Sequence, residues 1–270
     1  MFVGLISVAV AAIATFGTTN EQTTNATVAE NEVTLRQVKH NAFGVGEKLT
    51  YRLHYGAIDA GEAIIKVESA SKKIKDRELL HVVGEGKSIS AFDWFFKVRD
   101  RYESYIDKDG VFPWLFIRRV DEGGFKINQD YTFYQHKKKV SDGQTLYNVP
   151  ENIQDMISSF YYARTLDYST AKVGDVFTIN TFVDGEIFPL KIKYLGKETV
   201  KIRNGKYRCL KFAPVIQTGR VFKSEEDLNV WITDDGNKIP LLAKAKILVG
   251  SIKMELTKYE NLANPIAKVD

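Results

Sequence analysis

Hydrophobic and polar residues alternate along much of the chain from Glu47 onward, with the period of two that is typical of β-strands. Apolar side chains occupy every second position of residues 49–55, and the same alternation returns at 63–67, 125–133 and 252–256. Because the intervening positions are mostly polar, each of these strands is expected to bury one face and expose the other.

Short turn motifs separate these segments. Pairs of Asp, Asn or Glu with Gly, some followed by a second Gly, occur at 109–110, 122–124, 142–143, 184–185, 204–205 and 235–236. Such pairs favour the tight turns of antiparallel hairpins, whereas parallel strands need long crossover connections. The spacing predicts roughly a dozen antiparallel strands.

One segment has helical periodicity instead. Ile153, Met156, Ile157 and Phe160 stand at i, i+3, i+4 and i+7, which places them on one face of a helix over 151–164. Asn148 and Glu151 have the spacing of a capping box at its start.

The segments on the two sides of this helix resemble each other. Val45–Thr50 is similar to Val173–Thr178, and Tyr105–Gly110 is similar to Trp231–Gly236, at offsets of 128 and 126 positions. Either one β-meander has been duplicated, or hairpins in both halves reuse the same turn residues. Duplication predicts pseudo-repeats over about 43–147 and 170–261.

Together these patterns predict an all-β, mainly antiparallel fold. We expect a curved sheet or open barrel made of two similar β-meanders with one intervening helix, in a single β-rich domain over residues 43–261.

The N-terminus differs in composition from the rest. Residues 1–17 are apolar and uncharged, shorter than the ~20 residues that span a bilayer as a helix, and Ala12-Ile13-Ala14 resembles a signal-peptide cleavage site. Residues 18–42 are expected to form a flexible leader. No Lys or Arg precedes the apolar run, so the segment is either a signal peptide whose start lies upstream or an uncleaved anchor. Both alternatives predict an exported, periplasmic or otherwise extracytoplasmic protein.

Composition excludes several classes of function. The formal net charge of +4 is spread along the chain, which argues against a nucleic-acid partner. A single cysteine, Cys209, and four scattered histidines give no metal-ligand spacing. No catalytic motif is present, so we predict neither a metal nor a cofactor nor catalytic residues, and an enzyme is the less favoured class.

Two segments of the first half contain candidate ligand-binding residues. Phe92, Trp94, Phe95 and Phe96 form a dense aromatic group that either packs into the core or offers an apolar surface to a lipid, a peptide or a membrane. Arg99 and Arg101 stand on one strand face with Glu103, as an ion-pair ladder or an anion site.

The predicted helix adds a third group of candidates. Asp155, Tyr161, Tyr162 and Arg164 either line a cleft or serve to cap and pack the helix.

Several motifs together resemble an exported bacterial family. Val45–Tyr51, Tyr55-Gly56, Gln154-Asp155, Phe160–Arg164 and Trp231–Asp235 with Ile239-Pro240 are similar to the domain of unknown function 3108 family, over about Phe43 to Asn261. That family brings no established substrate, cofactor or catalytic residue to these positions. A fainter similarity, at Trp231–Leu241, is to periplasmic lipoprotein carriers, which implies a half-open barrel.

We therefore expect an exported protein that binds or carries an apolar ligand, such as a lipid, in envelope maintenance. The alternative is a structural or interaction module that binds another envelope protein, with contact to a membrane surface as a further expectation. A hydrolase using carboxylates such as Asp155 or Glu103 is less favoured.

Overall fold

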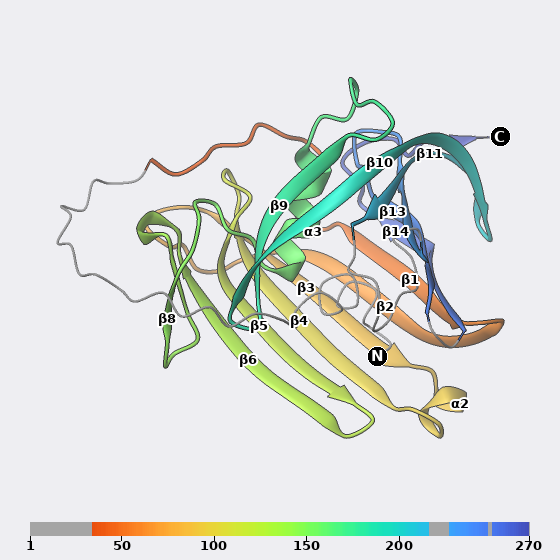
Figure 1. Ribbon diagram of the computed structural model, residues 1–270, viewed down its shortest axis with the longest axis horizontal. Coiled ribbons are helices and arrows are strands. Elements are labelled where there is room, and N and C mark those ends of the chain that lie inside the picture. The colour runs from red at the N-terminus through yellow and green to blue at the C-terminus, as the bar shows by residue number, and fades with distance from the viewer. Residues whose placement is uncertain (1–33, 216–226, 248–249, 270) are drawn as a thin grey trace.

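The computed structural model describes residues 34–215, 227–247 and 250–269. They form one strongly curved antiparallel sheet with a helix inside its curve, as Figure 1 shows. The all-β fold expected from the alternation is confirmed. The predictions for residues 1–33 lie outside the described residues.

The first half is a meander of hairpins with two short helices between strands, α2 (Ser90–Asp93) and the 3-10 turn η1 (Gln135–Lys137). Its strands are β1 (Lys48–Tyr55), β2 (Ile58–Ser69), β3 (Leu79–Ser88), β4 (Val98–Asp107), β5 (Pro113–Glu122), β6 (Phe125–Tyr134), β7 (Lys139–Ser141) and β8 (Leu146–Asn148).

The second half is a meander of similar construction. Its strands are β9 (Val176–Val183), β10 (Glu186–Ile202), β11 (Gly205–Pro214), β12 (Leu228–Thr233), β13 (Pro240–Lys246), β14 (Ser251–Glu260) and the short β15 (Lys268–Val269), which pairs with β11.

The two meanders join where β1 pairs with β14, so the sheet runs from β8 through β1 and β14 to β9. Among the described strands, the two edges β8 and β9 do not pair with each other. Side chains meet across the gap instead: the rings of Tyr147 and Phe182 lie 5.1 Å apart, and Gln154 forms a parallel bridge with Thr181. The sheet is therefore strongly curved without closing into a barrel.

The segments that resembled each other occupy matching places in the two meanders. Val45–Thr50 leads into β1 and Val173–Thr178 into β9, the first strand of each meander. Gly46 and Gly174 precede them with φ of 96° and 101°, a backbone conformation that glycine adopts without strain. The second pair of segments lies at the end of β4 and of β12, the fourth strand of each. Duplication stays a prediction.

The helix between the meanders, α3 (Met156–Thr165), begins later than the expected residue 151. Asp155 is its N-cap: one carboxylate oxygen accepts the backbone N–H groups of Ile157 and Ser158, at 2.7 and 2.6 Å. Ser158 completes the capping box by accepting the Asp155 N–H at 2.8 Å. Residues 152–154 are not helical because Gln154 pairs with β9, so the capping box expected from Asn148 and Glu151 is wrong.

The end of the expected leader is held by the domain. Arg36 donates to the carbonyl oxygens of Gly110 and Val111, at 2.9 and 2.7 Å, and Ala42 is buried in the core. Residues 36–42 therefore differ from the flexible segment expected there. No helix within the described ranges is long and apolar enough to cross a membrane.

Candidate functional site: an apolar cavity beside helix α3

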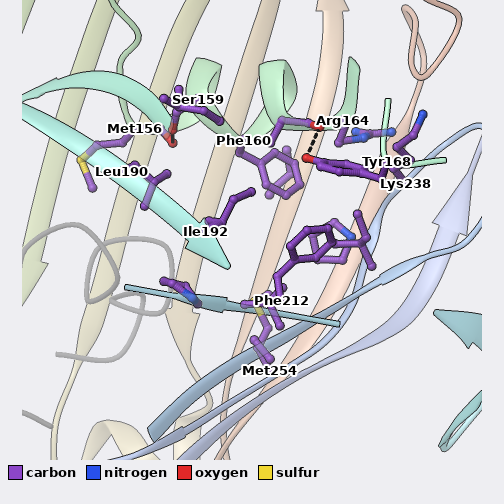
Figure 2. A pocket seen from close by; sticks show the side chains of 18 of the residues that line it. Met156, Ser159, Phe160, Arg164, Tyr168, Leu190, Ile192, Phe212, Lys238 and Met254 are labelled. Carbon is purple, nitrogen blue, oxygen red and sulfur yellow. Dashed lines mark hydrogen bonds between the residues drawn. The ribbon is translucent and has the colours of Figure 1, made fainter. Parts of the chain in front are cut away.

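A cavity of about 160 Å³ lies between α3 and the inner face of the sheet, mostly that of the second meander. Figure 2 shows it from close by, with the helix on one side and strands on the other. Its lining is almost entirely apolar. A space of this kind can hold an apolar ligand, because such ligands bury most of their surface in concave apolar sites.

The helix forms one wall. Met156, Phe160 and Ala163 repeat at i, i+4 and i+7, so they share the face that looks into the cavity. Ser159 also lines the wall, but its hydroxyl donates to the carbonyl oxygen of Met156 at 3.1 Å. The Tyr168 hydroxyl donates to the Ala163 carbonyl oxygen at 2.8 Å, drawn as a dashed line in Figure 2. Because both hydroxyls donate to backbone carbonyl oxygens, this wall presents a mainly apolar surface to the cavity.

The sheet forms the other walls because alternate residues of each strand face inward. Leu190 and Ile192 of β10 line the cavity, whereas Lys191 and Lys193 are exposed. The other lining residues come from strands of both meanders, and Lys238 comes from the β12–β13 connection: Tyr51, Ile65, Ile179, Phe212, Pro214, Val230, Ile232, Lys238, Pro240, Ala243 and Met254.

Besides the charged residues Arg164 and Lys238, Tyr51 in β1 brings a polar group to the cavity lining. Its side chain is almost fully buried among the lining residues, and within the described part of the chain its hydroxyl has no hydrogen-bond partner. Burial raises the pKa of this hydroxyl well above its ordinary value, so it is a neutral donor. An unpaired buried hydroxyl is costly, and a ligand that offers an acceptor would remove that cost.

Arg164, at the end of α3, lines the cavity with part of its side chain, but its guanidinium group forms an ion pair with Glu47. Its two terminal nitrogens donate to the two carboxylate oxygens of Glu47, both at 2.7 Å. The remaining donors reach the carbonyl oxygens of Ala42 and Asn237, at 3.0 and 2.9 Å. Both charged groups are buried, so this pair ties the helix to β1 and is not available to an anionic ligand.

The other helix candidates lie outside the cavity lining. Tyr161 is fully buried and its hydroxyl donates to Glu47 at 3.4 Å. Tyr162 packs under the guanidinium group of Arg36, 4.1 Å from the ring centre. Asp155 caps the helix and accepts the Ser104 hydroxyl at 2.6 Å. Burial raises the pKa of Asp155 to about 6, against the effect of these hydrogen bonds.

The aromatic candidates of the first half lie at the far end of the β3–β4 hairpin, away from the cavity. Phe92 is buried against Ala60 and Val98, and Phe96 packs beside it. Trp94 and Phe95 are instead 92% and 73% exposed. Phe92 and Phe96 therefore pack into the protein, whereas Trp94 and Phe95 form an exposed apolar surface.

Arg99 and Arg101 lie on the outer face of the sheet, where they take part in ion pairs. Arg101 pairs with Glu85 on β3 and with Glu103 at 2.7 Å, and Glu103 also bonds His81 at 2.7 Å. Arg99 pairs with Asp93 at 2.6 Å. Arg101–Glu85 is thus a cross-strand ion pair, whereas Arg99 pairs with a residue of α2.

Neither a metal site nor a pair of catalytic carboxylates is assembled in the described residues. They contain no group of three His, Cys, Asp or Glu side chains placed to hold a metal ion. Asp155 is buried at the start of α3, whereas Glu103 faces outward among ion pairs. The two acids considered for hydrolysis share no cleft.

Sequence reasoning placed Met156 and Phe160 on the apolar face of a helix but not in a site, and it named Tyr51 only as a strand residue. Periodicity identifies the buried face but not which part of that face remains uncovered. Only Arg164 of the ten candidates lines the cavity.

Comparison with known proteins agrees with this fold. Residues 50–257 match the family described as "Protein of unknown function (DUF3108)". The chain belongs to the DUF3108 family. The resemblance seen in the sequence is thereby confirmed. No curated protein matches the sequence.

Two solved structures are similar to this DUF3108 protein. One is a β-barrel-like protein of domain of unknown function DUF1849 from Brucella abortus, with 10% identity and a TM-score of 0.51 over 84% of this chain and 99% of that one. The other is the hypothetical protein CT021 from Chlamydia trachomatis, with 8% identity and a TM-score of 0.36 over 84% and 93%. The first shows the fold alone.

Proposed function

We propose that this protein is an exported binding or carrier protein whose ligand is an apolar molecule, such as an acyl chain, held in the cavity beside α3. The observation that carries the proposal is the cavity itself: about 160 Å³ lined by aliphatic and aromatic side chains. Its walls offer dispersion contacts and exclude water, which favours apolar ligands over polar ones.

The volume of the cavity limits how much of an apolar ligand it can hold. A dry apolar cavity of roughly 150 Å³ accommodates a benzene-sized group, which corresponds to a short stretch of hydrocarbon. About six methylene groups at roughly 0.8 kcal/mol each would contribute about 5 kcal/mol. A longer chain would place only its end here and extend outward.

Tyr51 further restricts the chemistry of the ligand. Its hydroxyl, which has no partner within the described residues, can donate one hydrogen bond in a lining that is mostly apolar. The matching ligand has one acceptor next to a hydrocarbon segment, as the carbonyl group of a fatty acid or an acyl ester does.

The apolar, uncharged segment 1–17 supports export, and a carrier of lipids has its substrates in the cell envelope.

The test is mass spectrometry of organic extracts from protein purified gently from its own envelope. Ala243 is 3% exposed and lines the cavity, so Ala243→Phe would fill the space. Val173→Ser with Leu146→Ser is the control, because these residues are exposed and do not line the cavity.

A stoichiometric acyl compound in the wild type and the control, but not in Ala243→Phe, is the expected result. A folded wild-type protein without any apolar compound, which also fails to bind added fatty acid, would overturn the proposal. Retention of the compound by Ala243→Phe would place its site elsewhere.

A further inference from the structure

Three hairpin turns of the first meander expose large apolar side chains at the same end of the sheet. Ile58 begins β2, Trp94 and Phe95 follow α2, and Phe125 begins β6; their exposed fractions are 60%, 92%, 73% and 65%. We call these four residues the hairpin-tip patch. Side chains this apolar and this exposed, gathered at one end of a molecule, mark a contact surface.

The turns are held together by contacts between them. The N–H of Gly123, in the β5–β6 turn, donates to the Lys97 carbonyl oxygen after α2 at 2.8 Å. The N–H of Ile89, before α2, donates to the Ala60 carbonyl oxygen of β2 at 3.1 Å. Figure 1 shows α2 and the β5–β6 turn at this end of the molecule.

Packing beneath the patch keeps its members exposed. Phe92 and Phe96 anchor the α2 turn in a small cluster with Ala60 and Val98. Phe96 lies against Gly123, where a Cβ would be 2.6 Å from its ring, so the site requires glycine. Trp94 and Phe95 lie between these two anchors along the chain and outside the cluster, with exposed fractions of 92% and 73%.

The outer face of the second meander contributes positive charge. Lys193, Lys211, Lys244 and Lys246 line a groove of about 520 Å³ on β10–β13, together with Trp231 and one acidic residue, Asp227. The ammonium groups of Lys211 and Lys244 lie 5.1 and 5.5 Å from the Trp231 ring. Among the described residues, none of the four lysines forms an ion pair.

This groove borders the end of the sheet that carries the patch. Lys246 is opposite Ser251 in the β13–β14 pairing, and the Ser251 carbonyl oxygen accepts the N–H of Gly56, in the β1–β2 turn, at 2.8 Å. Ile58 follows two residues later. The lysines and the apolar turns are thus neighbours along one rim.

We infer that this rim docks on an anionic lipid bilayer. The hairpin-tip patch would enter the interfacial region, where Trp and other aromatics are favoured, and the lysines would be attracted by anionic headgroups. Pro214 lines both the groove and the cavity beside α3, so docking would bring the cavity near the membrane. The inference goes beyond the proposed function and does not require an occupied cavity.

The experiment is sedimentation of the full chain with vesicles of phosphatidylcholine alone or with about 30 mol% phosphatidylglycerol, whose anionic headgroups give the vesicle a negative surface potential. Trp94→Ser with Phe95→Ser should lower the partition coefficient at least about tenfold, because two exposed apolar side chains no longer enter the interface. Lys244→Gln with Lys246→Gln should lower it about fivefold per lysine on anionic vesicles only.

Matched controls test whether a loss of vesicle binding is specific to the rim or follows from removing any exposed apolar or charged side chain. Val173→Ser with Leu146→Ser removes apolar side chains that are 72% and 53% exposed on other segments. Lys72→Gln with Lys73→Gln removes charge from the β2–β3 connection, at the opposite end of β2. Both should bind like the wild type, and so should Ala243→Phe. All variants share one N-terminus, so differences between them do not arise from residues 1–17.

Three results would overturn the inference: no binding of the wild type to anionic vesicles, equal binding by the Trp94/Phe95 variant, or equal loss in the controls. Capture of one envelope protein by the wild type, lost in the Trp94/Phe95 variant while vesicle binding is absent, would assign the rim to a protein partner instead. Because Ala243→Phe reports on the cavity alone, the two proposals fail independently.

Discussion

The two meanders hold the same helix differently. Towards the first meander, Ile157 packs against β3, where Gly84 offers no side chain and a Cβ would lie 3.6 Å from the Ile157 terminal methyl. Towards the second meander, Met156 and Phe160 face the cavity. A sheet made of two similar halves therefore encloses a helix asymmetrically, packed on one side and open on the other.

Polar contacts fix both ends of α3. At its start, Asp155 accepts a hydrogen bond from Ser104 of β4, and at its end Arg164 pairs with Glu47 just before β1. Arg164 also donates to the Asn237 carbonyl oxygen of the second half, at 2.9 Å. The comparison teaches that the helix is fixed at its two ends, whereas its middle faces the second meander across an apolar cavity.

Loss of the Arg164 anchor should have the largest effect on stability. Arg164→Ala leaves the buried Glu47 carboxylate without its partner, which should lower the free energy of unfolding by about 3–5 kcal/mol in urea denaturation. The double variant Glu47→Gln with Arg164→Met should lose less, because no charge stays buried. Equal losses in both would show that packing, and not the charge, holds the helix.

Neighbouring residues of α3 test the asymmetry directly. Ile157→Ala should cost roughly 3 kcal/mol, since it opens a void on the packed side. Met156→Ala should cost about 1 kcal/mol less, because its side chain already borders an open space. Equal costs, measured by denaturant unfolding at one pH, would contradict the difference between the two sides.

The buried carboxyl of Asp155 predicts that the stability of the fold depends on pH. Burial raises the pKa of its carboxyl from an ordinary 3.8 to about 6, so between these values the folded state binds the proton more tightly than the unfolded chain. Stability from this group is full below about pH 4 and is lost as the pH rises through 6, by roughly 3 kcal/mol.

The Asp155→Asn variant isolates this contribution. Its amide oxygen can still cap the helix but does not titrate. The difference in unfolding free energy between wild type and variant should therefore change between pH 4 and pH 7, in favour of the variant at the higher pH. A constant difference would show that folding does not raise the pKa of this carboxyl.

The smallest expected effect is at the cavity. Tyr51→Phe removes a buried hydroxyl without a partner in the described residues, so thermal unfolding of the empty protein should show unchanged stability or a gain of about 1 kcal/mol. Affinity for a fatty acid should fall about fivefold, through the lost hydrogen bond. A variant that is clearly less stable yet binds as before would show that Tyr51 is structural.

Much of this architecture could be predicted from local patterns. Alternation over 49–55 and 252–256 identified strands that prove to be β1 and β14, and the Asp-Gly turns identified hairpins. These predictions succeed because a strand exposes its periodicity in the sequence itself, and because a turn needs particular residues at particular places. The helix start was missed because the pairing of Gln154 with Thr181, a tertiary contact, competes with local capping.

The sequence by itself determined the all-β class, the single intervening helix and the family. The tertiary structure alone decided which apolar side chains pack and which stay uncovered. Arg164 looked available for a ligand until its partner Glu47, 117 positions away, was in place. Ile58 and Phe125 joined Trp94 only through the hairpins that bring their turns to one end. Cavities and patches arise from contacts between residues distant along the chain, which a periodic pattern does not record.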